Sequence, residues 1–201
     1  LNKSLKIANK FSKNKKNIIV FGTGGSNLGS RALINVMQGK QKKNILFFDN
    51  IDPIYFNNSI KEINLNNSGF IIISKSGKTP ETLSQLGCLV ELYKDRYNVK
   101  KLFNNSLIIT ENTENPLRLI GNQYRCTILD HELDIGGRYS IFSNVGMIPS
   151  IIAGVDVKKF HKGADSILKK INNNSFYNYL KLPQFFSSIN NEKLLSNNVI
   201  F

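Results

Sequence analysis

Short apolar runs alternate along the chain with longer stretches in which apolar residues recur at helical spacing. Four of the runs consist mainly of Ile, Val, Leu and Phe, and each ends in a turn rich in polar residues. Runs of this length and composition are typical of strands that are buried on both faces. The predicted strands span residues 17–21, 44–48, 69–73 and 106–110, and a weaker fifth spans 125–129.

Helical spacing fills the intervals between these strands. The predicted helical stretches are 28–37, 53–63, a segment that begins at Pro80, a segment that begins at Pro116, and then 143–152, 157–171 and 176–189. Strands that alternate with helices predict an α/β fold, with a doubly wound, mainly parallel five-stranded sheet flanked by helices. In such sheets ligands bind beyond the carboxyl ends of the strands.

The domain organisation follows from the same pattern. We predict an amphipathic helix within residues 1–16, one α/β domain over 17–155, and a helical connection over 156–201. A chain of 201 residues with 41% hydrophobic residues can bury one sizeable core. The first residue is not Met, so we expect a fragment of a longer chain. The apolar run 198–201 resembles the opening of a strand that is cut short, so we expect the truncation at the C-terminus.

A net charge of +13 makes anionic partners a natural expectation. The lysines are scattered among abundant Asn and Ile, without the interleaved aromatic and basic residues of nucleic-acid-binding modules, so we expect no nucleic-acid partner. No apolar run reaches membrane-spanning length and no signal peptide precedes the first strand, so we expect a cytoplasmic protein without a membrane partner. We expect Cys88 and Cys126 to pack as small apolar residues, and we expect no metal and no cofactor.

The loop after the third strand carries the strongest chemical signal, the segment Ser74-Lys75-Ser76-Gly77-Lys78-Thr79-Pro80-Glu81-Thr82. Pro80 suits the first position of a helix, and Thr79 suits the N-cap before it. Three hydroxyls and free backbone N–H groups would then lie at the positive end of a helix, where a phosphate binds well. The alternative is a hydroxyl-rich turn that only caps the helix.

A nucleotide-binding P-loop is excluded at this position. The sequence Gly77-Lys78-Thr79 resembles the end of that motif, but the motif also requires a glycine five residues before Gly77. That position is Ile72, in the middle of the predicted strand.

The loop after the first strand contains Gly22, Gly24, Gly25 and Gly29. A dinucleotide-binding fingerprint would need its third glycine where Asn27 stands, so we do not expect that function. The glycines would let a ligand approach the backbone, and Ser26 offers a hydroxyl at the start of a helix. Alternatively, this is a tight turn whose glycines only permit packing.

The loop after the fifth strand presents Arg138 within Gly136-Gly137-Arg138-Tyr139-Ser140. A guanidinium held by such a turn could stabilise an oxyanion or bind a phosphate. The alternative is a surface arginine paired with Asp130 or Asp134. Because all three loops follow parallel strands, we expect them to converge at one edge of the sheet.

Together these loops resemble the glucose-6-phosphate isomerase (phosphoglucose isomerase) family. The segments Gly24 to Gly29, Ser74 to Thr82 and Gly136 to Ser140 occur in that family's order, and the resemblance covers nearly the whole chain. It implies the first sugar-isomerase (SIS) domain of a two-domain enzyme of glycolysis and gluconeogenesis. Many members have Thr where Ser76 stands and Phe-Thr where Gly77-Lys78 stand; the Ser-Gly form resembles the shorter bacterial and archaeal versions.

The resemblance also assigns roles to individual residues. Ser74, Ser76 and Thr79, with the backbone around Lys75, would hold the phosphate of glucose 6-phosphate or fructose 6-phosphate. Gly25, Ser26 and Gly137 would line the sugar, and Arg138 would steady the enediolate intermediate. The implied reaction is an aldose–ketose isomerisation through a cis-enediol, with the complete enzyme a homodimer.

The family's catalytic base, a glutamate, has no match in this chain, nor do its ring-opening histidine and late lysine. We therefore expect the chain alone to be inactive, with the base and a second SIS domain beyond residue 201. His131 and His161 are interpreted as structural, Glu81 as a helix-start charge and Glu132 as a loop residue. The alternatives are a non-catalytic module that senses a phosphosugar, and a bifunctional phosphoglucose/phosphomannose isomerase.

Overall fold

The computed structural model describes residues 1–37, 43–96 and 98–172. The chain divides into two compact units, residues 1–157 and 158–201, and each is considered by itself. The predicted helix at 176–189 and the predicted strand opening at 198–201 lie outside the described residues.

The first unit is built on one five-stranded parallel sheet, as the sequence predicts. The strands are β1 (Asn17–Phe21), β2 (Asn44–Phe48), β3 (Ser68–Ile73), β4 (Ser106–Glu111) and β5 (Thr127–His131). They lie in the order β2-β1-β3-β4-β5, and all four neighbouring pairs are parallel. This order brings the carboxyl ends of β1 and β3, which are not consecutive strands, next to each other.

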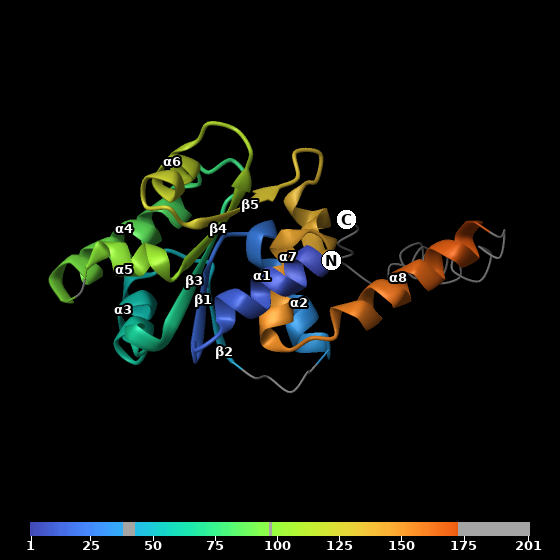
Figure 1. The fold of residues 1–201 in the computed structure, drawn as a ribbon, viewed down its shortest axis with the longest axis horizontal. Helices are drawn as coiled ribbons and strands as arrows, with labels where there is room; N and C mark the ends of the chain where they lie inside the picture. Colours follow the sequence, from blue (N-terminus) through green and yellow to red (C-terminus); the bar gives the residue numbers. More distant parts are fainter. Residues whose placement is uncertain (38–42, 97, 173–201) are drawn as a thin grey trace, which may run out of the picture. The chain divides into compact units, whose positions relative to one another are not determined.

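Helices cover both faces of the sheet (Figure 1). On one face lie α3 (Pro53–Lys61), α4 (Pro80–Arg96), α5 (Val99–Asn104) and α6 (Pro116–Gln123), and on the other α1 (Asn2–Ser12), α2 (Gly25–Met37) and α7 (Asn144–Ala153). Two 3₁₀ helices complete the unit, η1 (Leu65–Asn67) and η2 (Gly137–Phe142). The helix α8 (Val157–Asn172), which belongs to the second unit from Lys158 onward, matches the helix predicted at 157–171.

Burial explains why the apolar runs become central strands. Every residue of β3 is buried, and four of the five residues of β1 are buried. Helices cover both faces of these strands, so near-continuous Ile and Phe are favourable at these positions. Among the described residues, no helix is long and apolar enough to cross a membrane.

Capping residues set the helix starts that the sequence indicates. The side chain of Asp52 accepts hydrogen bonds from the backbone of Ile54 and Tyr55 at the start of α3. Asn115 accepts one from Arg118 at the start of α6, directly before Pro116. Both helices therefore begin with an Asx cap followed by proline, which is the expected combination.

The predicted fifth strand is displaced by two residues, because Arg125 adopts a left-handed conformation with a φ of 55°. The N–H of Arg125 donates to the carbonyl of Asn122, and the N–H of Cys126 donates to the carbonyl of Gly121. This turn ends α6, so the pairing of β5 with β4 starts only at Thr127. The short helix α5 was not predicted. It is capped by Asn98 and buries Leu102 and Phe103.

The burial of β3 predicts a strong contrast between two identical substitutions. Ile72 is fully buried, whereas Ile54 on α3 is 71% exposed. We expect Ile72→Ala to lower the free energy of unfolding by about 2–5 kcal/mol, because it leaves a cavity in the core. Ile54→Ala should change it by no more than about 0.5 kcal/mol. Urea denaturation followed by circular dichroism measures both, and equal effects would contradict the assignment of β3 to the core.

Candidate functional site

The loops after β1, β3 and β5 meet at the carboxyl edge of the sheet, where the sequence places its candidate residues. Gly22, directly after β1, lies against the end of β3: a Cβ atom on it would be 3.2 Å from the carbonyl oxygen of Ile73. The same Cβ would lie 2.9 Å from Cβ of Ser26 at the start of α2. The first loop can approach β3 this closely only because residue 22 has no side chain.

The loop after β1 and the loop after β5 touch through their backbones. A Cβ atom on Gly25 would lie 2.4 Å from the carbonyl carbon of Gly137 and 2.5 Å from its Cα atom. The Ser140 hydroxyl adds a link, 2.6 Å from Gly137 O and 3.3 Å from Gly25 O. Gly25 and Gly137, both proposed to line a sugar, are therefore in direct contact, and Ser26 is the next residue on α2.

The loop between β3 and α4 is a compact turn with a pair of hydroxyls. The Oγ of Ser74 and the Oγ1 of Thr79 are 2.7 Å apart, within hydrogen-bonding distance. Ser74 is buried and Thr79 half-buried, while Ser76 is exposed and its Oγ accepts a bond from the N–H of Lys78. Thr79 precedes Pro80 as predicted, and its carbonyl accepts from Leu83. The hydroxyls therefore lie at the start of α4, where the first N–H groups have no partner within the helix.

The turn of this loop is held from behind by the start of α6. Gly77 has a φ of 65°, and a Cβ on it would be 1.9 Å from Oδ1 of Asn115. The Gly77 carbonyl also accepts a hydrogen bond from the N–H of Leu117, with a donor–acceptor distance of 3.3 Å. Any side chain at position 77 would be strained and would collide with Asn115. Asn115 is thus a supporting residue that the sequence marked only as a helix start.

A network around Asn115 stabilises that support. Its Oδ1 accepts from the N–H of Arg118 at 2.9 Å, and its Nδ2 donates to the carbonyl of Thr113 at 3.0 Å. The guanidinium of Arg118 donates to the carbonyls of Glu111 and Thr110 at the end of β4 and pairs with Asp130 of β5. The loop is therefore supported from behind by a hydrogen-bonded network that joins the start of α6 to the ends of two further strands.

Lys75 links the hydroxyl loop to the segment that leads to Arg138. Its Nζ donates to the carbonyl of Leu133 at 2.7 Å and lies 3.6 Å from a carboxylate oxygen of Glu111. The Lys75 backbone carbonyl accepts from the N–H of Glu111 at 3.0 Å. The side chain is thus engaged by the neighbouring loops, and the backbone of this residue remains the part that could face an anion.

Arg138 is exposed on η2. Among the described residues it forms no ion pair, and Asp130, one of its two expected surface partners, pairs with Arg118 instead. The guanidinium is free to contact a ligand beside Gly137.

His131 is buried, and its Nδ1 lies 3.0 Å from the Glu132 carbonyl, in keeping with a structural role.

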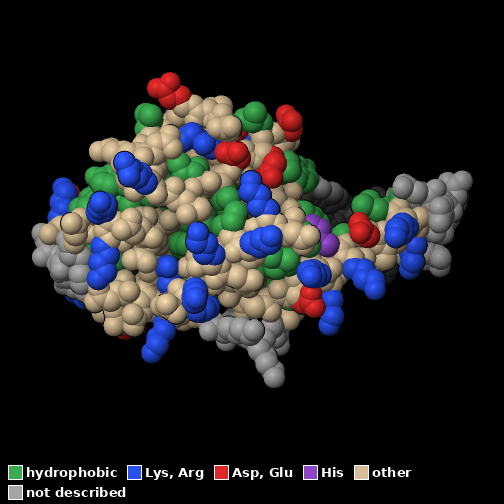
Figure 2. Space-filling view, in the orientation of Figure 1, with side chains coloured by type: hydrophobic (Ala, Val, Ile, Leu, Met, Phe, Trp, Pro, Cys, Tyr) green, Lys and Arg blue, Asp and Glu red, His purple; other side chains and the backbone are tan. Residues whose placement is uncertain are grey.

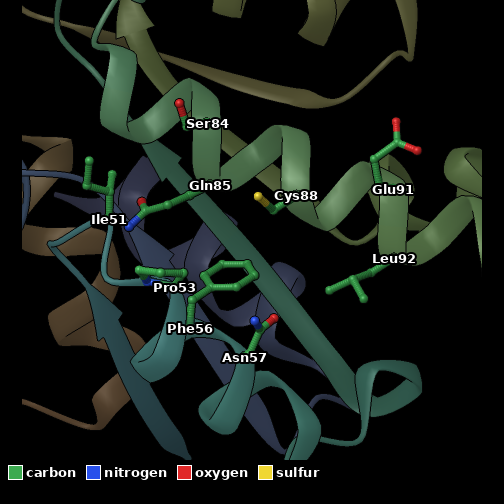
Figure 3. Close-up of a pocket in the computed structure, with 9 residues that line it drawn as sticks. All are labelled: Ile51, Pro53, Phe56, Asn57, Ser84, Gln85, Cys88, Glu91 and Leu92. Atoms are coloured by element: carbon green, nitrogen blue, oxygen red, sulfur yellow. The ribbon is translucent and has the colours of Figure 1, made fainter.

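A pocket of about 360 Å³ lies between α3 and α4, away from the candidate residues (Figure 3). Its walls are mainly apolar, with Ile51, Phe56 and Leu92, and Gln85 and Cys88 also line it. Cys88 is exposed here, so the expectation that it packs in the interior is wrong. Cys126 is half-buried, and burial raises the pKa of its thiol to about 11.

Comparison with known proteins gives a consistent result. The family model described as phosphoglucose isomerase matches residues 6–197. A probable glucose-6-phosphate isomerase of Methanococcus maripaludis is 35% identical over 166 residues, covering 80% of this chain and 37% of the relative. A glucose-6-phosphate isomerase of Campylobacter jejuni is 33% identical over 152 residues, covering 74% of this chain and 36% of the relative. The chain therefore spans well under half the length of these relatives.

Solved structures share the fold. A hypothetical protein of Thermus thermophilus superposes with a TM-score of 0.75 at 22% identity, over 82% of this chain and 40% of the other. A glucose-6-phosphate isomerase of Chlamydia trachomatis gives a TM-score of 0.67 at 24% identity, over 76% of this chain and 29% of the other. At these identities the likeness establishes the α/β architecture.

The contact between Gly25 and Gly137 predicts that position 25 tolerates no side chain. We expect Gly25→Ala to destabilise the chain by about 1–3 kcal/mol, because the added methyl group would force the two backbones apart. Gly87→Ala is a matched control, since Gly87 lies on α4 with no atom within 4 Å of an added Cβ. The control should stabilise the helix by up to about 1 kcal/mol. Thermal unfolding of both variants measures the difference; a neutral Gly25→Ala would argue against the contact.

Proposed function

Because the chain belongs to the phosphoglucose isomerase family, we propose that it forms the phosphate-binding part of a glucose-6-phosphate isomerase. The reaction is the interconversion of glucose 6-phosphate and fructose 6-phosphate. The observation that supports this most directly is the meeting of three loops at one edge of the sheet, with the Ser74–Thr79 hydroxyl pair at the start of α4. An anion there would meet hydroxyl donors and the positive end of a helix.

In this proposal the loop between β3 and α4 holds the 6-phosphate. Ser74, Ser76 and Thr79 provide hydroxyls, and the backbone around Lys75 provides N–H groups. The hydrogen-bonded network of Asn115 and Arg118 keeps the loop in one conformation before the ligand arrives. Preorganised donors bind more tightly because little conformational freedom is lost on binding.

The sugar lies over Gly25, Ser26 and Gly137, where the backbones of the two glycines already touch. Isomerisation moves a proton between C1 and C2 through a cis-enediol, and negative charge develops on the sugar oxygens in the transition state. Arg138 is the residue that we propose to stabilise this charge, since its guanidinium is exposed beside Gly137 and has no carboxylate partner among the described residues. A cation at this point favours the enediolate over the neutral sugar.

The base that removes the proton is not assigned within this chain. We propose that it belongs to a part of the complete enzyme with no counterpart here, together with a second SIS domain, and that the complete enzyme is a homodimer. The relatives' greater length is consistent with such an additional part.

The phosphate assignment predicts a ligand-specific loss of binding. Ser74→Ala and Thr79→Ala together should weaken binding of glucose 6-phosphate by roughly 1.5–3 kcal/mol for each hydrogen bond lost to the charged group. Binding of unphosphorylated glucose should change little. Isothermal titration calorimetry with both sugars tests this, and Ser84→Ala, an exposed serine on the same helix, is the control. Equal weakening for both sugars would refute the phosphate assignment.

The absence of an assigned base predicts that the 201-residue chain binds phosphosugar but does not isomerise it. A coupled assay for fructose 6-phosphate conversion measures this, with the Campylobacter jejuni enzyme as positive control. Catalysis requires a base within hydrogen-bonding reach of the C1/C2 proton. Turnover that survives repurification would place the base within this chain, and Glu81 and Glu132 would then be the first residues to replace.

A further inference from the structure

A second pocket lies at the amino end of the sheet, the edge opposite the proposed phosphosugar site. It has a volume of about 270 Å³ and is enclosed by α1 and the turn after it, the end of α5, and the first residues of β4 and β5. We call it the amino-edge pocket. It is lined by Ile7, Lys10, Phe11, Lys15, Asn104, Ser106 and Thr127. Its polar lining therefore contains lysine, amide and hydroxyl groups, and no acidic residue within the part of the chain that the structure describes.

Lys15 is a partly buried lysine of this pocket. Its aliphatic stem packs across Gly69 at the start of β3, where an added Cβ would lie 2.5 Å from Cδ of Lys15. Its Nζ lies 4.9 Å from the centroid of the Phe11 ring. Burial, with a further contribution from nearby Lys43, lowers the pKa of Lys15. This ammonium group is thus partly removed from water, and no carboxylate of the described residues pairs with it.

Two other charged side chains near Lys15, those of Lys10 and Lys43, are also positive. Lys43 donates to the backbone carbonyls of Ser12 and Lys15, at 2.9 and 2.5 Å, so it is held close to the pocket by the turn after α1. Lys10 is exposed on the last turn of α1 and lines the pocket with Lys15. None of the ion pairs among the described residues involves these lysines. Figure 2 shows Lys and Arg side chains across the middle of the face in view, with several acidic side chains toward its top.

We propose that the amino-edge pocket binds a small phosphate-bearing anion. The ammonium groups of Lys10 and Lys15 would pair with its oxygens, and Thr127 and Asn104 would provide neutral hydrogen-bond donors. An anion would supply the opposite charge that the pocket lacks, in a cavity far larger than the roughly 30 Å³ that one water molecule occupies. The site lies at the other edge of the sheet from Ser74 and Thr79, so it is additional to the proposed phosphosugar site.

Phosphate titration in two matched double variants tests the proposal. The titrations use inorganic phosphate at fixed ionic strength, followed by calorimetry, in the 201-residue chain carrying Ser74→Ala and Thr79→Ala so that the proposed phosphosugar site does not contribute. Lys10→Gln with Lys15→Gln should weaken phosphate binding by at least about tenfold, since two charge-assisted contacts are lost. Lys13→Gln with Lys16→Gln removes the same charge from two exposed lysines outside the pocket and should change it by less than about threefold.

Two outcomes would overturn the proposal: no saturable phosphate binding, or equal weakening in both double variants, which would indicate only the general positive field of the chain. Because Lys15 also packs on Gly69, its replacement could unfold the chain. Lys10→Gln alone leaves that packing intact and should still weaken binding several-fold, so an unchanged affinity in this folded variant would also overturn it.

Discussion

The backbone contact between Gly25 and Gly137 is the constraint on which the arrangement of the candidate site depends. The two residues are far apart in sequence, and they meet because β1 lies near the centre of the sheet while the segment after β5 folds back over the start of α2. A side chain on Gly25 would displace η2 and with it Arg138. The backbone position of Arg138, whose guanidinium pairs with no carboxylate of the described residues, thus depends on two glycines that lie in contact. The Ser140 hydroxyl reinforces this contact.

The hydroxyl loop depends on a different kind of support. Its turn at Gly77 is packed against Asn115, which is itself fixed by Arg118 and the end of β4. Lys75 then extends to the carbonyl of Leu133, on the segment that leads to η2. The two halves of the proposed site, one for phosphate and one for the sugar, are therefore connected by the Lys75 side chain as well as by the sheet.

The sequence predicts the parts of the fold that depend on local pattern. The buried strands β1 and β3 follow from continuous Ile and Phe, and the starts of α4 and α6 follow from Thr79-Pro80 and Asn115-Pro116. It could not predict what depends on distant contacts. The displaced start of β5 results from the left-handed turn at Arg125, and the exposure of Cys88 results from which face of α4 meets the sheet. Likewise, the motifs indicated which residues were candidates, but only the fold shows that Gly25 touches Gly137.

The hydrogen bond between Ser74 and Thr79 has a consequence for how the two hydroxyls would bind an anion. Ser74 is buried and Thr79 is more accessible, so an anion would meet Thr79 first. If Thr79 turns its proton toward an anion, its oxygen is free to accept the proton of Ser74, and the two bonds polarise each other in the same direction. Ser74 would then act as a relay behind the contact, and the energetic effects of the two residues would not be additive. Two hydroxyls in series therefore make Thr79 a somewhat stronger donor than an isolated hydroxyl would be.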